Sequence, residues 1–265
     1  HLATFPNGQQ LLSVLLAQNI EVWMLAVNQS QTEQMSTYLS KRFALSAQEL
    51  EGLKPIPIPT QTVWARDWAP LISYSTSNPQ DIGLIDFKYY PDRSIDDAVS
   101  KGFTSLLSTG FDLFNIQARF PDLNYRNLPV DVEIEGGNVM CTDKNCFVTE
   151  EVLRRYELNQ GVRPDPETIR AALEEHLDQK FWIVPRIPIE GTGHIDIWAK
   201  LLNANHLIIG EISEESLSLV PEELRWDYTQ VKEFLDQQAT GKDLLGNEVP
   251  GSLAAIIKQV HPEIK

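Results

Sequence analysis

Three short polar clusters hold the side chains of this sequence that could do chemistry together. They are Arg66-Asp67 between Trp64 and Trp68, then Glu135-Gly136-Gly137-Asn138, then Gly193-His194-Ile195-Asp196. Carboxylates gathered at one buried centre repel one another unless a cation lies between them. A planar guanidinium meets that need, because its fork of donors pairs with carboxylates in a bidentate manner. A histidine beside it could exchange protons near neutral pH.

Each cluster alone also has an ordinary structural interpretation. The tryptophans could fill a core while Arg66 and Asp67 pair with neighbours. A His-x-Asp pair on a strand often only forms a mutual hydrogen bond, and Gly-Gly is typical of a turn or bulge. A metal ion bound by the His and the carboxylates is a further alternative, although no His-rich or Cys-rich ligand spacing occurs. Of the other histidines, His176 is expected to be structural on a helix face, and His206 to be exposed.

The elements that must position these clusters follow a repeated order of hairpin, helix and strand. The expected first unit comprises strands 70–75 and 82–89, a helix from Asp96 to about 107 and a strand at 114–120. The second comprises a hairpin of 132–140 with 147–149, a helix opened by Asp165 and Pro166, and a strand at 181–185. The third has strands 195–202 and 207–212, then helices at about 227–237 and 252–260. Equivalent strand ends of pseudosymmetric units converge, so we expect the clusters to meet at one centre.

The residues before the first cluster predict two helices and two strands. Apolar spacing favours a helix at 9–18 and a strand at 21–27. Ser30 and Glu33 form a capping-box pattern for a helix that runs to about Arg42. A proline-rich strand is expected at 55–59.

Composition limits the classes of function. The 265 residues carry a net charge of −15, which argues against a nucleic-acid partner because such proteins need a basic surface. No apolar run approaches the roughly 18 residues that span a bilayer, so no membrane partner is expected. Cys141 and Cys146 bracket a predicted hairpin turn, where a disulfide and two free thiols are both compatible with the sequence.

The three clusters, in this order, resemble motifs of the pentein guanidino-group-modifying hydrolases, in particular the bacterial-type peptidylarginine deiminase and agmatine deiminase group. Trp64-Ala-Arg-Asp-Trp-Ala-Pro70 is similar to that group's Trp-x-Arg-Asp-x-Gly-Pro, with Ala69 in place of the usual glycine. Glu135-Gly-Gly and Gly193-His-Ile-Asp196 match its other two segments. The resemblance implies an α/β propeller of repeated hairpin-helix-strand units, here a single domain over 1–265 that is incomplete at the C-terminus.

The resemblance also implies roles for individual residues. Asp67 and Asp196 would clamp the substrate guanidinium, His194 would act as general acid and base, and Glu135 would support them. The remaining substrate-contacting residues would be Trp64, Arg66, Trp68, Gly136, Gly137 and Asn138. Arg93, in the loop after the first hairpin, could receive a substrate carboxylate or form a surface ion pair with Asp92, Asp96 or Asp97.

The expected reaction is hydrolytic deimination of peptidyl arginine to peptidyl citrulline, or of agmatine to N-carbamoylputrescine, with release of ammonia and without a metal or organic cofactor. The family's nucleophilic cysteine has no counterpart here, since Cys141 and Cys146 lie in the second hairpin. Two alternatives stay open, a non-catalytic arginine-binding module and a metal-dependent hydrolase. The expected partner is a small guanidino substrate or an arginine-containing protein, and a homo-oligomer is left open. A sequon at Asn28-Gln-Ser30 and the missing initiator Met lean towards a secreted or periplasmic location, with the cytoplasm as the alternative.

Overall fold

The computed structural model of the protein describes residues 6–25, 29–56, 58–108, 122–175, 177–203, 206–262 and 264. Contacts between Cα atoms divide the chain into two compact units, His1–Leu128 and Pro129–Lys265. Each unit has buried apolar clusters of its own. Three sequence predictions fall outside the described residues: the strand at 114–120, the sequon residue Asn28 and the role of His176.

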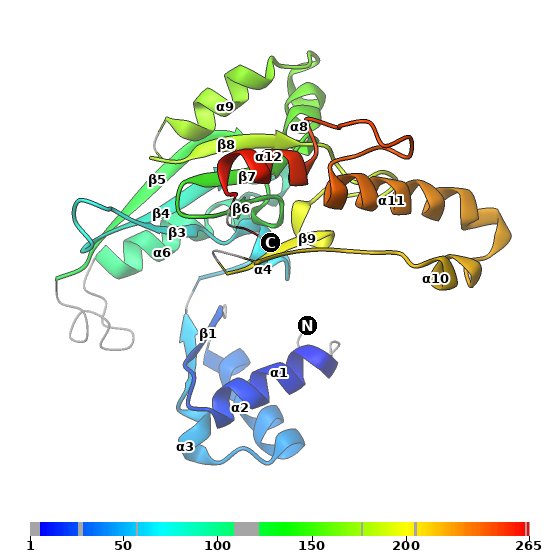
Figure 1. Ribbon diagram of the computed structural model, residues 1–265. Helices are drawn as coiled ribbons and strands as arrows, with labels where there is room; N and C mark the ends of the chain where they lie inside the picture. The colour runs from blue at the N-terminus through cyan, green and yellow to red at the C-terminus, as the bar shows by residue number, and fades with distance from the viewer. Residues whose placement is uncertain are drawn as a thin grey trace. The chain divides into compact units, whose positions relative to one another are not determined.

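The first unit opens with helices around a small parallel sheet (Figure 1). Its elements there are α1 (Pro6–Ala17), β1 (Val22–Leu25), α2 (Gln29–Phe43), α3 (Ala47–Leu50) and β2 (Leu53–Ile56). The predicted helix, strand and second helix are confirmed. The capping box at Ser30 is wrong, because α2 begins at Gln29 and Ser30 lies inside it. The capping box belongs to α3 instead, where Ser46 and Glu49 cap each other's backbone N–H groups.

The first polar cluster lies in the short helix α4 (Ala65–Trp68). The chain continues through β3 (Leu71–Tyr74), β4 (Asp81–Lys88), α5 (Ser94–Asp97), α6 (Val99–Ser108) and β5 (Asn124–Glu133), which runs on into the second unit. Strands β3 and β4 form the predicted antiparallel hairpin, and β5 is the third strand of their sheet. The helix predicted from Asp96 is two helices, α5 and α6.

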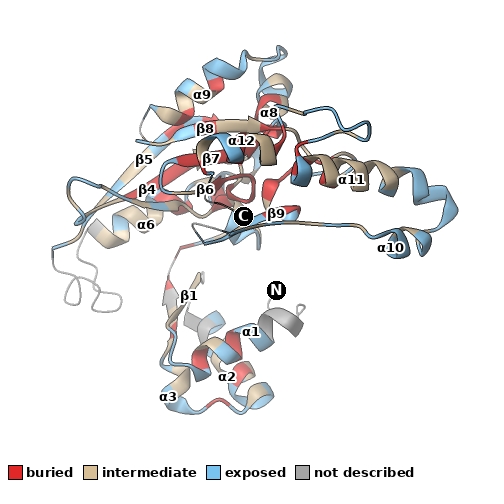
Figure 2. Ribbon diagram, in the orientation of Figure 1, coloured by how far each residue is buried: buried red, intermediate tan, exposed pale blue. Residues whose placement is uncertain are grey.

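The second unit is built around the sheet β6-β7-β8 (Figure 1). Its elements are β6 (Met140–Cys141), β7 (Asn145–Thr149), α8 (Glu151–Gln160), α9 (Pro166–Glu174), β8 (Lys180–Val184), β9 (Ala199–Asn203), β10 (His206–Ile209), α10 (Glu214–Ser218), α11 (Glu222–Thr240) and α12 (Leu253–Val260). Strand β7 is antiparallel to β6 and parallel to β8. All five of its residues are buried (Figure 2), and Phe147 packs in one core with residues of α11 and α12. The sheet of this unit therefore has a fully packed central strand.

Several predictions for this unit are confirmed by local signals. Asp165 caps α9 by accepting a hydrogen bond from the N–H of Glu167, and Pro166 is its first residue. Ile169 and Leu173 form its buried face. Cys141 and Cys146 face each other across the β6–β7 hairpin and are joined in a disulfide, so the free-thiol alternative is wrong.

Other boundaries differ from the prediction, and the differences lie at the polar clusters. The strand expected over 132–140 is interrupted, since β5 ends at Glu133 and β6 holds only Met140–Cys141. Between them, Glu135 to Val139 close a single 3₁₀ turn through the bonds Asn138 N–H to Glu135 O and Val139 N–H to Gly136 O. Likewise residues 195–197 form a 3₁₀ turn, and β9 starts at Ala199. The proline-rich strand predicted over 55–59 is β2, which covers Leu53–Ile56. Pro57 lies outside the described residues. A mixed α/β fold is confirmed, and the closed propeller stays a prediction.

Candidate active site

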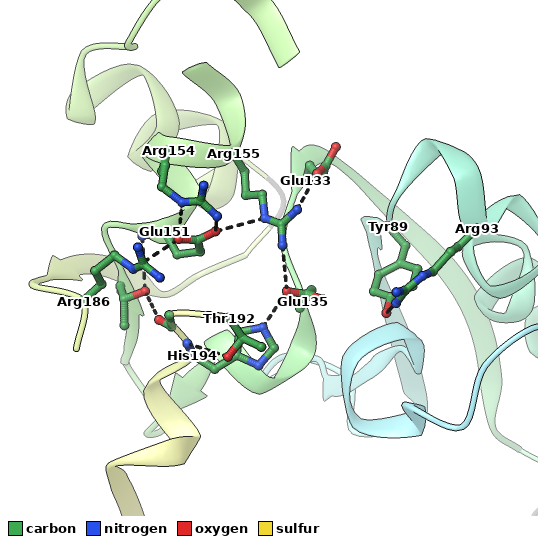
Figure 3. Close-up of polar contacts among 12 residues, drawn as sticks. Tyr89, Arg93, Glu133, Glu135, Glu151, Arg154, Arg155, Arg186, Thr192 and His194 are labelled. Atoms are coloured by element: carbon green, nitrogen blue, oxygen red, sulfur yellow. Dashed lines mark hydrogen bonds and ion pairs between the residues drawn. The ribbon is translucent and has the colours of Figure 1, made fainter. Parts of the chain in front are cut away.

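Glu135 and His194 meet in the second unit, although 59 residues separate them in sequence. Nε2 of His194 lies 2.6 Å from Oε2 of Glu135, and Figure 3 shows the two side chains facing each other. His194 is buried, and only 11% of the Glu135 side chain is exposed. Each residue directly precedes a 3₁₀ turn, and these two turns pack against each other. Two of the three sequence motifs therefore supply one acid–base pair.

The end of β7 ties the two motifs together. Thr149 donates its backbone N–H to Oδ1 of Asn138 at 3.1 Å and its hydroxyl to the carbonyl oxygen of Gly193 at 2.6 Å. All three residues are buried. Asn138 is thus held by the end of β7, and Thr149 also fixes the backbone immediately before His194. Sequence reasoning missed Thr149, because nothing in its neighbourhood marks it as a link between distant loops.

The loop before His194 is organised by the carboxylate of Glu190. It accepts hydrogen bonds from the N–H of Thr192 at 2.9 Å, the Thr192 hydroxyl at 2.8 Å and the N–H of Gly193 at 2.5 Å. Burial raises the pKa of the Glu190 carboxyl, but these bonds and the nearby charge of His194 outweigh burial and lower the pKa overall. Glu190 therefore holds negative charge beside the histidine.

An arginine network backs the pair and was also missed. Glu151, the first residue of α8, is buried among Arg154, Arg155 and Arg186 (Figure 3). Arg155 also reaches Glu135, with its Nη2 atom 3.6 Å from Oε2. The spacing of Glu151 and Arg155, four residues apart on one helix, was the only sequence signal, and such pairs usually lie on the surface.

Asp196 is partly buried on the 3₁₀ turn that follows His194. Gly136 and Gly137 are buried in the turn after Glu135. Asp67 lies on α4 of the first unit, where it is partly buried. That Asp67 and Asp196 grip one guanidinium stays a prediction.

The aromatic and basic residues of the first cluster divide by exposure. Trp68 is buried in the core with Tyr89 and Val99, whereas Trp64 and Arg66 are exposed. The expectation that both tryptophans fill a core is therefore confirmed for Trp68 and wrong for Trp64.

Arg93 stacks on aromatic side chains in the first unit. Its Cζ atom lies 4.8 Å from the ring centre of Tyr90, and its Nη1 donates to the Tyr89 hydroxyl at 2.9 Å. Asp96 instead accepts bonds from residues 61 and 62, and Asp97 accepts from the N–H of Tyr89. The geometry thus favours an aromatic-supported guanidinium over the ion pair with Asp96 or Asp97.

Two other features bear on the class of function: metal-binding clusters and membrane-spanning helices. Within the described part of the chain, no cluster of three or more His, Cys, Asp or Glu side chains has the arrangement of a metal site. Within the same residues, no helix combines the length and apolar character needed to cross a bilayer. His206 is exposed as expected, with Nδ1 2.9 Å from Asn203 Oδ1.

Solved structures place this fold among the pentein-type deiminases. The crystal structure of a protein provisionally assigned as a peptidyl-arginine deiminase is similar to this fold, with a TM-score of 0.61 and 17% sequence identity. The match covers 93% of this chain and 67% of that protein. A provisional arginine deiminase from Porphyromonas gingivalis gives 0.62 at 14% identity, over 92% of this chain and 66% of the other. The agmatine deiminase of Enterococcus faecalis gives 0.55 at 16% identity, over 90% of this chain and 59% of the other. The chain thus spans about two-thirds or less of these proteins.

The family itself follows from the sequence match. Residues 9–255 match the model of the Porphyromonas-type peptidyl-arginine deiminases, and the chain belongs to that family. No curated protein sequence matches it.

Proposed function

We propose that the whole protein is a guanidino-group deiminase that hydrolyses peptidyl arginine or agmatine. The guanidinium and one water become a ureido group and ammonium. The observation that carries the proposal is the 2.6 Å contact between Glu135 and His194, because it joins two of the family's motifs in one buried acid–base pair. Family membership over residues 9–255 supports the same reaction class.

In this proposal the carboxylates of Asp67 and Asp196 bind the two edges of the substrate guanidinium. A planar guanidinium cannot lose its charge in water at neutral pH, so carboxylates are the groups that bind it best. Trp64 and Arg66, both exposed, would contact the remainder of the substrate, and Trp68 would fix α4 in the core.

His194 would move the protons. An ionised Glu135 can only accept, so the Nε2 atom of His194 that faces it carries a hydrogen. Nδ1 is then the nitrogen left to take up and release protons. A carboxylate behind the ring stabilises the imidazolium that forms when Nδ1 takes a proton.

The nucleophile in this proposal is a cysteine outside the 265 residues, because both cysteines of the sequence are joined in the hairpin disulfide. A thiolate adds to the guanidinium carbon, and ammonia leaves with a proton from His194. Water then attacks the thiouronium carbon while His194 takes one of its protons. The C–S bond breaks as the C=O bond forms, which releases the ureido product and the thiolate, and the second proton of the water passes to the released ammonia.

The test is ureido-product detection on the whole protein with agmatine, free arginine and an internal arginine peptide. Activity on at least one substrate is expected, with a loss of at least about 100-fold in kcat for His194→Gln. His206→Gln, at an exposed position, is the matched control and should retain activity. Binding of these substrates without ureido product would instead identify an arginine-binding module and end the enzymatic proposal.

Asp67→Asn and Asp196→Asn test the clamp. Each removes one charge-assisted pairing, so each is expected to lower kcat/KM by roughly 10-fold or more. If either variant keeps full kcat/KM on every substrate, that residue has no part in guanidinium binding.

A further inference from the structure

Glu151 is a buried carboxylate that no family motif includes. Its side chain is 3% exposed. Arg154 donates through Nε at 2.8 Å and Nη2 at 2.6 Å, Arg155 through Nε at 3.0 Å, and Nε of Arg186 lies 3.3 Å away. The cations around so deeply buried a carboxylate offset its loss of solvation. Glu151 is thus a fixed anchor for the arginines around it.

Arg155 connects this anchor to the acid–base pair. Its Nε edge is bonded to Glu151, and its Nη2 atom points at Oε2 of Glu135, 3.6 Å away. Its Nη1 atom lies 4.0 Å from Glu133. The guanidinium is planar and rigid, so fixing one edge fixes the direction of the other nitrogens. Glu151 therefore determines where Arg155 presents its charge.

The same oxygen of Glu135 contacts both Arg155 and His194. Oε2 lies 3.6 Å from Arg155 Nη2 and 2.6 Å from His194 Nε2 (Figure 3). The cation favours the ionised form of the carboxylate, and this form is the stronger acceptor for the histidine N–H. Without Arg155, Glu135 loses an ionic contact at the oxygen that faces His194.

The other side of the network bears on the backbone before His194. A Cβ atom on Gly193 would lie 3.0 Å from Oε2 of Glu151 and 2.7 Å from Nε of Arg186. Gly193 therefore packs directly on the Glu151–Arg186 ion pair. The two halves of the acid–base pair are thus supported from one buried carboxylate.

We propose that Arg155, anchored by Glu151, is a positioning residue that holds Glu135 ionised and directed at His194. Its relevance to catalysis rests on the proposed function, but the positioning itself is a property of the second unit. An ion-pair network that only stabilises the fold would not require Arg155 in particular to control the histidine.

The test is the titration of His194 followed by NMR of the imidazole Hε1 proton, with the signal assigned through its loss in His194→Gln. The variants are Arg155→Met, Arg155→Lys and, as matched control, Arg154→Met. Arg154 is the neighbouring arginine, and its hydrogen bonds shown in Figure 3 go to the same Glu151 carboxylate. The contacts place three other charged residues beside His194 and Gly193, and all three are unchanged in every variant: Glu190, Glu151 and Arg186.

The sign of the shift separates two explanations. If Arg155 positions Glu135, Arg155→Met frees the carboxylate, His194 loses its partner, and its pKa falls by about 1 unit or more. If Arg155 is only a nearby cation, its removal favours the imidazolium and the pKa of His194 rises. Arg154→Met is expected to change the pKa by less than about 0.5 unit. A rise in Arg155→Met, or an equal fall in Arg154→Met, would overturn the proposal.

Arg155→Lys tests the geometry and carries the experiment if Arg155→Met does not fold, as judged by far-UV circular dichroism. A lysine keeps the charge but has no rigid fork that spans Glu151 and Glu135. We expect a fall in the same direction as for Met, whereas a wild-type titration curve would reject positioning by the fork. The NMR titration needs no turnover. An absence of deiminase activity would therefore reject the proposed function without affecting the conclusion on positioning.

Discussion

Nδ2 of Asn145 lies 2.9 Å from Nε2 of His261, joining the central strand β7 to the residue that follows α12. The direction of this hydrogen bond is fixed by Trp182, whose indole N–H can only donate and lies 2.8 Å from Oδ1 of Asn145. The amide NH₂ of Asn145 must therefore face His261, so Nε2 of His261 is the acceptor. The Thr142 hydroxyl lies 2.8 Å from the same nitrogen.

This relationship predicts a specific cost for removing the acceptor. His261 and Asn145 are both buried, so His261→Leu leaves the amide NH₂ without a partner and should lower the free energy of unfolding by about 1–3 kcal/mol. His261→Gln can present an amide oxygen to the same group and should cost less. Urea denaturation measures both.

The control is His206→Leu, at an exposed histidine, which should change stability by no more than about 0.5 kcal/mol. If His261→Leu lowers the free energy of unfolding by no more than this control, the buried hydrogen bond makes no net contribution to stability.

Gly193 and Gly161 form a natural pair for testing the packing behind the acid–base pair. Both have positive φ, +70° and +74°, so an alanine strains the backbone equally at each site. Only Gly193 is crowded, since nothing lies within 4 Å of a Cβ on Gly161. Gly161→Ala should lower the free energy of unfolding, measured by urea denaturation, by about 1 kcal/mol. Gly193→Ala should cost clearly more, because its Cβ meets the Arg186–Glu151 ion pair; equal costs would mean that this loop shifts freely.

Elements with local signals could be predicted from the sequence, and elements defined by distant contacts could not. Asp165 and Pro166 mark the start of α9 whatever surrounds them, because the cap and the proline act within one turn. Helix α8 was missed because its first residue, Glu151, is a buried charge, and apolar periodicity does not identify a face that includes one. Strand β5 was missed for a related reason, since only two of its ten residues, Val130 and Val132, are buried.

The residues of the candidate site also divide into those that the sequence marks and those that only distant contacts define. Glu135 and His194 were found because a family resemblance marks both motifs. Thr149 and Arg155 were not, although they contact Asn138, Gly193 and Glu135. Their role depends on strand β7 and helix α8 bringing them to loops distant in sequence. A single sequence holds no local signal for such contacts.

Glu190 gives a pH-dependent prediction. The pKa of its carboxyl is lowered from the ordinary value of 4.5, so it contributes stability that is fully present above about pH 4.5 and is lost as pH falls through the lower folded-state pKa. Glu190→Gln should therefore be less stable than the wild type at pH 7, and the two should converge in acid. The measurement is the free energy of unfolding in urea between pH 7 and pH 3.

Glu157→Gln serves as control for Glu190→Gln, since Glu157 forms an exposed ion pair with Arg163 and such pairs contribute little. We expect only a small difference from the wild type at every pH. A constant gap between wild type and Glu190→Gln down to pH 3 would mean that the carboxylate's charge does not stabilise the loop.

Arg93 supplies the last prediction, which concerns the form of the substrate. Burial alone would lower the pKa of its guanidinium, but the hydrogen bond with Tyr89 and the nearby charges of Tyr89, Tyr90 and Asp92 together outweigh burial and raise the pKa, so Arg93 is always a cation. Held by Tyr89 and Tyr90, it is suited to accept a substrate carboxylate. In the whole protein, Arg93→Ala should lower kcat/KM for peptides that end in arginine by roughly 10- to 100-fold, and should leave the same peptides unaffected when amidated. Arg126→Ala, at an arginine 68% exposed, is the control, and an equal loss on free and amidated peptides would reject carboxylate binding by Arg93.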